Sequence, residues 1–113
     1  MDKVSVVITV KNDLDGVKAL LEDLAKQTVR ADEVIVIRAE DYQNCSRGRG
    51  RNIGIKRARN EIIAVTDVGC RPHRDWLLKL TVPLLNKEAD VTSGFYQTIA
   101  QTYLQKAIAP YLA

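Results

Sequence analysis

The stretch VSVVITV, residues 4–10, decides how the rest of this chain can be interpreted. It is β-branched at most positions and apolar almost without interruption, which is typical of a strand buried on both faces of a sheet. Two later stretches, EVIVI at residues 33–37 and IIAVT at residues 62–66, repeat the pattern. The sequence therefore predicts three buried strands.

The segments between these strands have helical spacing. Leu14, Val17, Leu20, Leu21 and Leu24 recur at three- and four-residue intervals, which predicts a helix that Asn12 or Asp13 caps and that ends near Gln27. A second helix is predicted over roughly 48–59, with Asn60 at its C-terminal end. This alternation favours parallel strands joined by right-handed crossovers, a Rossmann-like α/β sheet with helices on both faces.

The C-terminal third of the chain is less regular. Residues 75–85 predict a third helix, which Pro83 is expected to end or kink because proline lacks the amide hydrogen. Residues 90–97 predict a further strand. Ile99, Tyr103, Ala107 and Tyr111 lie four apart, which predicts an amphipathic helix that is interrupted near Pro110.

Length and composition indicate one globular domain. The chain has 113 residues, of which 46% are hydrophobic and 27% are charged, so we assign residues 1–113 to a single domain. Its apolar runs are too short for a transmembrane segment or signal peptide, which predicts a cytoplasmic protein. Cys45, Cys70 and one histidine are too few ligands for a structural zinc site, so we expect free thiols.

Positive charge is concentrated in the second predicted helix. The net charge is +3, and residues 47–59 contain five arginines and Lys56 with no acidic residue among them. A segment of this kind can bind nucleic acid, bind a phosphate-bearing small molecule, or form a solvated helix face. Gly50, Gly54 and Ala58 leave one stripe of the helix almost without side chains, which suits either close packing on the sheet or a nearby ligand.

Candidate ligand-binding residues follow each predicted strand. In open α/β sheets, ligands bind beyond the carboxyl ends of the strands. Residues 11–13, 38–41 and 67–71 occupy those positions and contain both cations and carboxylates. This composition can hold a phosphate directly and a metal ion through a carboxylate.

The order and spacing of these segments resemble the family-2 glycosyltransferases of the GT-A fold. The resemblance covers residues 4–97, and its most specific part is RNIG at residues 51–54 followed by the third strand and Asp67. It implies transfer of a sugar from a nucleotide-diphosphate donor to an acceptor hydroxyl, usually with inversion. By position, the donor base and ribose would lie along Thr9, Val10, Lys11 and Asn12. Arg51 would approach the base or phosphates, and Asp67 would match the first aspartate of the family's D-x-D element, near the ribose and metal.

Three departures from the family pattern change these expectations. Arg38 stands where the family usually has an aspartate that reads uracil, unless Glu40 or Asp41 substitutes. The D-x-D element ends in Gly69, so binding of Mg²⁺ or Mn²⁺ through Asp67 alone is expected to be weak. Arg71 or the arginines of the second helix could instead neutralise the diphosphate.

The third departure concerns the catalytic base, which the family takes from a later acidic residue. The resemblance therefore implies either a donor-binding half or a shortened homologue, whose exposed sheet edge would pair with a second copy or a partner chain. Two alternatives stay open: a nucleic-acid-binding module that uses the basic helix, and a catalytically silent homologue that serves in binding or oligomerisation.

Overall fold

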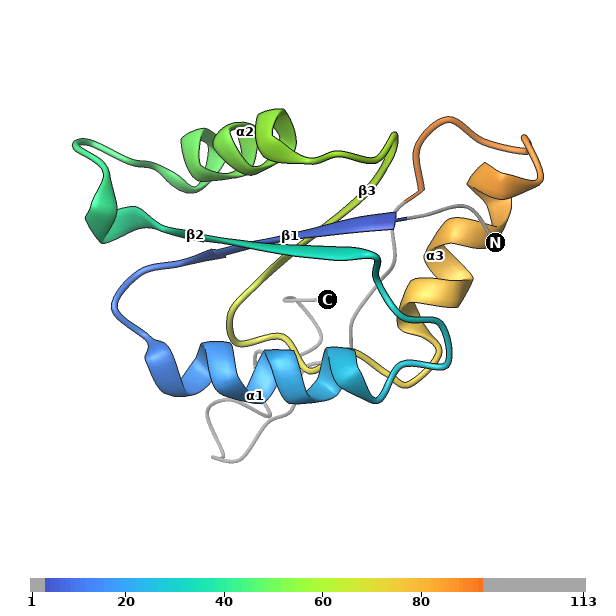
Figure 1. The fold of residues 1–113 in the computed structure, drawn as a ribbon, viewed down its shortest axis with the longest axis horizontal. Coiled ribbons are helices and arrows are strands. Elements are labelled where there is room, and N and C mark those ends of the chain that lie inside the picture. Colours follow the sequence, from blue (N-terminus) through green and yellow to red (C-terminus); the bar gives the residue numbers. More distant parts are fainter. Residues whose placement is uncertain (1–3, 93–113) are drawn as a thin grey trace, which may run out of the picture.

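We describe residues 4–92 in a computed structural model of the chain. The fold is α/β, a three-stranded parallel sheet flanked by helices, as the sequence predicts (Figure 1). The elements in chain order are β1 (Val4–Val10), α1 (Leu14–Ala25), β2 (Glu33–Arg38), the short 3₁₀ helix η1 (Ala39–Asp41), α2 (Arg47–Arg57), β3 (Ile62–Asp67) and α3 (Trp76–Leu85).

β1 is the central strand of the sheet, whose order is β2-β1-β3. Both neighbours run parallel to it, with Val7 in register with Ile35 of β2 and with Val65 of β3. Each of the seven residues of β1 is buried, whereas β2 and β3 are mostly half-buried. The central position explains why β1 has the longest apolar run, because both of its faces and both of its edges are covered.

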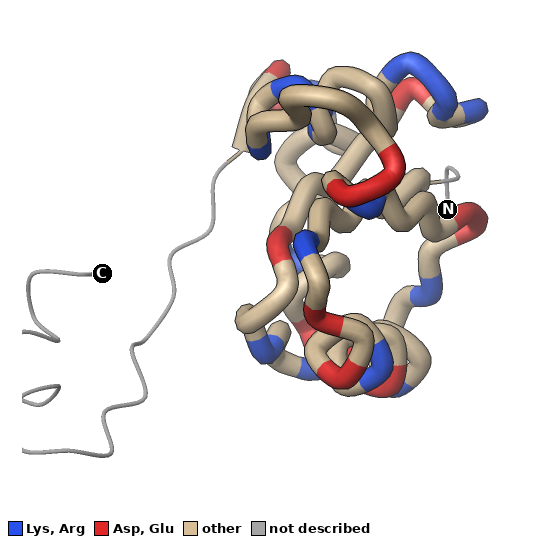
Figure 2. Tube along the Cα trace, turned by 90° about the vertical axis from the view of Figure 1, so that its left-hand side faces the viewer, with Lys and Arg blue, Asp and Glu red and all other residues tan. Residues whose placement is uncertain are grey.

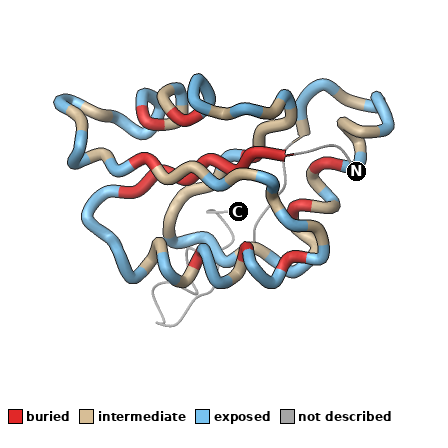
Figure 3. The backbone as a smooth tube through the Cα atoms, viewed as in Figure 1, coloured by how far each residue is buried: buried red, intermediate tan, exposed pale blue. Residues whose placement is uncertain are grey.

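The helices lie on both faces of the sheet. α2 crosses one face and α1 crosses the other, together with α3 (Figure 1). The main core forms on the side of α1, where Ile8 packs in one cluster with Leu20, Leu24 and Leu77. Figure 3 shows the buried positions gathered along β1 and on the inner sides of the helices.

Glycines let α2 pack very close to the sheet. A Cβ placed on Gly54 would lie 2.3 Å from Cγ1 of Val7, and a Cβ on Gly50 would lie 3.3 Å from Cγ2 of Thr9. Both glycines are buried. Close packing thus accounts for Gly54, while Gly50 lies against Thr9 where β1 nears its carboxyl end.

Side-chain hydrogen bonds set the helix boundaries. Asp13, and not Asn12, caps α1, with its Oδ1 accepting from the amide of Gly16 at 2.9 Å. α1 ends at Ala25, two residues before Gln27 and close to the predicted end. The side chain of Gln27 helps to fix the start of α3, since its Oε1 accepts from the amide of Leu77. Ser46 caps α2, which begins one residue earlier than predicted and ends two residues earlier.

α3 matches the predicted helix over 75–85 to within one residue and contains Pro83 in its last turn. The helix continues through this residue to Leu85, so the proline does not end it on the spot. At this position the missing amide hydrogen removes only one backbone hydrogen bond, and the helix ends two residues later. None of the described helices is long and apolar enough to cross a membrane.

The predicted strand over residues 90–97 is wrong in the part that the structure describes. Residues 90–92 form no strand. The chain here is tied to α3 instead, because the hydroxyl of Thr92 donates to the carbonyl oxygen of Leu80 at 2.7 Å. The remainder of that strand and the helix predicted over 99–111 lie outside the described residues.

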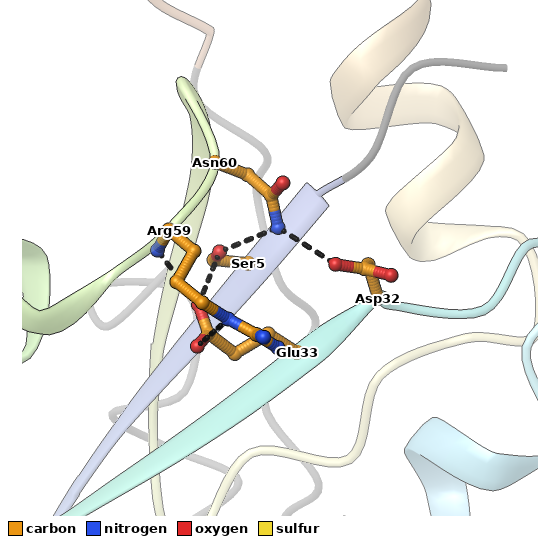
Figure 4. A network of polar contacts seen from close by, with 5 residues as sticks. All are labelled: Ser5, Asp32, Glu33, Arg59 and Asn60. Carbon is orange, nitrogen blue, oxygen red and sulfur yellow. Dashed lines mark hydrogen bonds and ion pairs between the residues drawn. The ribbon is translucent and has the colours of Figure 1, made fainter.

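A polar network closes the end of the sheet where the strands begin (Figure 4). Ser5, which is fully buried, donates to Glu33 at 2.8 Å and accepts from Nδ2 of Asn60 at 3.0 Å. Nδ2 of Asn60 also donates to Asp32, and the amide and guanidinium of Arg59 donate to Glu33. The network joins β1, β2 and the turn before β3, which helps to hold the parallel register.

Candidate functional site

The three strands end at the same edge of the sheet, and the segments that follow them diverge there. The chain leaves β1 toward α1 on one face and leaves β2 toward α2 on the opposite face (Figure 1). Adjacent strands whose connections go to opposite faces leave a crevice between them, the usual ligand position in open α/β sheets. Figure 2 views the molecule from this edge, where basic and acidic residues both occur.

A pocket of about 270 Å³ opens at this edge, and we call it the edge pocket. The β1 side contributes Thr9, Val10, Lys11 and Asp13, and the end of β3 contributes Asp67 and Val68. The opposite wall comes from the end of β2 and the start of α2, with Ile37, Ala39, Cys45, Arg47 and Gly50. The lining thus mixes apolar and charged side chains, as small-molecule sites commonly do.

A chain of hydrogen bonds joins three residues at the inner side of the edge pocket. The hydroxyl of Thr9 donates to Oδ1 of Asp67 at 2.5 Å, and the guanidinium of Arg51 donates to Oδ2 at 2.7 Å. The side chains of Arg51 and Asp67 are 40% and 24% exposed, so this ion pair is partly shielded from water. Nε of Arg51 is buried without a hydrogen-bond partner within residues 4–92.

These contacts keep Asp67 ionised. Burial by itself would raise the pKa of the Asp67 carboxyl. The hydrogen bonds from Thr9 and Arg51, together with the charges of Arg51 and Arg47, outweigh burial, and the pKa lies below its ordinary value. Asp67 is therefore an anion that is already neutralised by a neighbouring guanidinium.

Lys11 and Arg47 are the two cations that line the edge pocket. Both are exposed, and within the described part of the chain neither forms an ion pair or a side-chain hydrogen bond. The other cations of residues 47–59 mostly have partners: Arg49 donates to the carbonyl of Gln43, Arg57 to the hydroxyl of Tyr42, and Arg59 to Glu33. Only part of the basic segment is thus available to a ligand.

Arg38, Glu40 and Asn12 form a separate cluster next to the edge pocket. Glu40 accepts from the amide of Asn12 at 3.1 Å, and Arg38 lies 3.7 Å from the same carboxylate oxygen. Hydrogen bonds from backbone amides, its own first and that of Asn12 next, help to lower the pKa of Glu40. The cluster joins the ends of β1 and β2, but none of its members lines the pocket.

Arg71 is not brought to the edge pocket. Its guanidinium binds both carboxylate oxygens of Asp23, at 2.6 and 3.3 Å, in the second half of α1. After β3 the chain turns at Gly69, whose φ is 101°, and then runs back beside α1, where the amide of Thr28 donates to the carbonyl of Arg74. This path directs Arg71 away from Asp67.

The residues at the edge pocket do not fit a divalent cation. Among residues 4–92, no three His, Cys, Asp or Glu side chains converge as a metal site would require. Both oxygens of Asp67 accept hydrogen bonds from the protein, and the guanidinium of Arg51 already holds Oδ2. A metal ion on this carboxylate would meet that positive charge at close range.

Sequence reasoning nominated part of this site and missed the rest. Of the nominated residues, Thr9, Val10, Lys11 and Asp67 line the edge pocket. Arg51 does not line it but forms an ion pair with Asp67. Ala39 lines the pocket from the nominated segment 38–41, whereas Ile37 and Cys45 were not nominated. The position of Ile37 near the end of β2 was the available signal, but only the structure shows that its side chain lies against Gly50 of α2.

Comparisons of the chain with protein-family models, with curated proteins and with solved structures find no match.

Proposed function

We propose that this chain binds a nucleotide-diphosphate sugar, as the donor-binding part of an inverting glycosyltransferase that resembles family 2 of the GT-A fold. The observation that carries the proposal is the edge pocket at the carboxyl ends of β1 and β2, lined by the unpaired cations Lys11 and Arg47. A diphosphate needs cations that are not already neutralised, and an open α/β sheet presents ligands at this edge.

The walls of the edge pocket suit the two ends of such a donor. Lys11 and Arg47 lie where charge-assisted hydrogen bonds can hold phosphate oxygens. Ala39 and Val68, which are both half-buried, offer a small apolar surface for a base or for the face of a sugar ring. Arg47 is the first residue of α2, and Ser46 caps the helix. The positive end of the helix dipole therefore lies at the pocket and favours an anion there.

In the proposed reaction an acceptor hydroxyl attacks the anomeric carbon of the sugar. The bond from that carbon to the diphosphate oxygen breaks, the nucleoside diphosphate leaves with the electron pair, and the acceptor proton passes to a base. Lys11 and Arg47 would stabilise the negative charge that develops on the leaving group. We assign donor binding to residues 4–92 and assign no residue among them as the base.

The partners within the basic segment favour this proposal over nucleic-acid binding. Arg49, Arg51, Arg57 and Arg59 each donate to an acceptor within the described residues. A nucleic-acid surface needs several free cations that track a phosphate backbone on one face. Titration with a labelled oligonucleotide at low and high salt separates the two functions.

The test is a thermal-unfolding screen with UDP, GDP, CDP, ADP and dTDP, each with and without Mn²⁺. A ligand at a hundred times its Kd adds about 2.7 kcal/mol of stability, so at least one nucleotide is expected to raise Tm by several degrees. Arg47→Gln is expected to reduce the shift, and Lys56→Gln, the same charge change at the other end of α2, is expected to keep it. No shift with any of these nucleotides would refute the proposal.

Sugar transfer is a separate measurement. If nucleotide binding is found while hydrolysis and transfer of the bound sugar stay undetectable, the chain acts as a silent binding homologue. If the nucleoside diphosphate is released in an acceptor-dependent way, the chain is a transferase.

A further inference from the structure

We infer that the edge pocket holds the diphosphate through Lys11 and Arg47 without a divalent cation, because Arg51 already occupies the position of a cation on Asp67. The inference rests on the proposed function and concerns how the same site binds its ligand.

The first step of the argument is the state of the Asp67 carboxylate. Its two oxygens accept from the hydroxyl of Thr9 and from the guanidinium of Arg51, at 2.5 and 2.7 Å. A divalent cation needs carboxylate oxygens that are free of competing positive charge. To bind here, the metal would have to displace a partly shielded ion pair and release Arg51, whose Nε is buried.

The second step is the absence of a supporting ligand at this end of β3. Two residues after Asp67 stands Gly69, which is exposed, has no side chain and has a φ of 101°. The other carboxylate at the pocket, that of Asp13, accepts from the amide of Gly16 to cap α1. Gly69 adds no ligand and Asp13 already uses Oδ1 as a helix cap, and among residues 4–92 no third acidic, histidine or cysteine side chain joins them to complete a metal site.

The third step is the charge that remains for an anion. Because Arg51 and Asp67 neutralise each other, the lining of the pocket retains Lys11 and Arg47 against the single carboxylate of Asp13. An incoming diphosphate does not have to break an ion pair to reach either cation. The arginine can also contact two phosphate oxygens at once, which is a role that a metal ion has in many other phosphate sites.

The test is isothermal titration of the full chain with UDP, GDP and ADP, in buffer with EDTA and in buffer with Mn²⁺. The nucleotide that binds is expected to have the same Kd in both buffers within about twofold. Arg47→Gln is expected to weaken binding by roughly tenfold or more in both buffers, as the loss of a charge-assisted contact should. Lys56→Gln, on the same helix but away from the pocket, is the matched control.

Asp67→Asn makes the sharpest contrast. Without the carboxylate, Arg51 is freed and one negative charge leaves the pocket, so we expect nucleotide binding to tighten by a few-fold. A metal-dependent site predicts the opposite, a loss of binding in Mn²⁺. Binding that appears only with Mn²⁺ would overturn this inference and leave the proposed function standing, whereas no binding in either buffer would overturn both. The comparison of buffers uses the unmodified chain and does not depend on how any variant folds.

Discussion

Gly54 of α2 lies directly over Val7 of β1, so close that a Cβ on the glycine would stand 2.3 Å from Cγ1 of the valine. The contact brings α2 down onto the central strand. It also fixes the start of that helix, with Arg47, at the edge pocket. Packing in the interior and the position of a candidate binding residue are thus set by the same close approach.

Gly54→Ala tests this approach. The added methyl group has no room beside the fully buried Val7, so we expect a loss of about 1–3 kcal/mol in the free energy of unfolding, despite the better helix propensity of alanine. Gly48→Ala is the matched control, because a Cβ there meets only Oγ of Ser46 at 4.0 Å. This control should stabilise the protein by up to about 1 kcal/mol. Equal effects in urea denaturation would contradict the packing argument.

Asp67 is expected to contribute to acid sensitivity. Burial would raise its pKa, but the contacts with Thr9 and Arg51 bring it below the ordinary 3.8 in the folded state. A carboxyl whose pKa is lower in the folded state stabilises the protein above its unfolded pKa, and that contribution is lost as the pH falls through the folded pKa. Stability should therefore decline below about pH 4 less steeply in Asp67→Asn than in the wild type.

The measurement for this prediction is the free energy of unfolding in urea between about pH 6 and pH 3. Asp23, Glu33 and Glu40 also have lowered pKa values, so the variant should keep part of the acid dependence. If the free energy of unfolding falls equally steeply with pH in the variant and the wild type, the contacts of Asp67 do not lower its pKa in the folded state.

Arg71→Gln tests whether a cation that follows β3 in the sequence also takes part in nucleotide binding. Arg71 follows β3 closely, but its guanidinium binds Asp23 on α1 at 2.6 Å. Exposed ion pairs contribute little, so we expect only a small loss of stability, and nucleotide affinity should not change. Calorimetric titration of Arg71→Gln beside Arg47→Gln checks this, and a comparable loss of affinity in both variants would contradict it.

The buried hydroxyl of Ser5 should be coupled to Asn60 across the start of the sheet. Ser5→Ala removes the donor to Glu33 and the acceptor for Asn60, and we expect it to cost about 1 kcal/mol. In a double-mutant cycle with Asn60→Ala, the two losses should add to more than the loss in the double variant, because the residues share a hydrogen bond. Strict additivity would contradict a direct interaction.

A residue of the site was predictable from the sequence where the end of a strand places it there, and not where a later turn or helix does. Thr9, Val10, Lys11 and Asp67 were predictable, since they lie at or just beyond the ends of strands and parallel strands end at one edge. Arg71 satisfied the same rule by sequence position but was carried away along α1 by the turn at Gly69. Pro83 marked the end of α3 only approximately, because the last turn of a helix tolerates one missing amide.

The sequence by itself determined the order of strands and helices, because periodic burial is a local property that residues 4–10, 33–37 and 62–66 display directly. Only the tertiary structure decided that Arg51 would neutralise Asp67 while Arg47 stayed free at the pocket. These arginines lie four residues apart on one helix, and which of them meets the carboxylate depends on how the helix is rotated and how closely it sits on the sheet. The glycine spacing marks a stripe of α2 that can pack closely, but only the contacts of Gly50 and Gly54 with Thr9 and Val7 of β1 set that rotation.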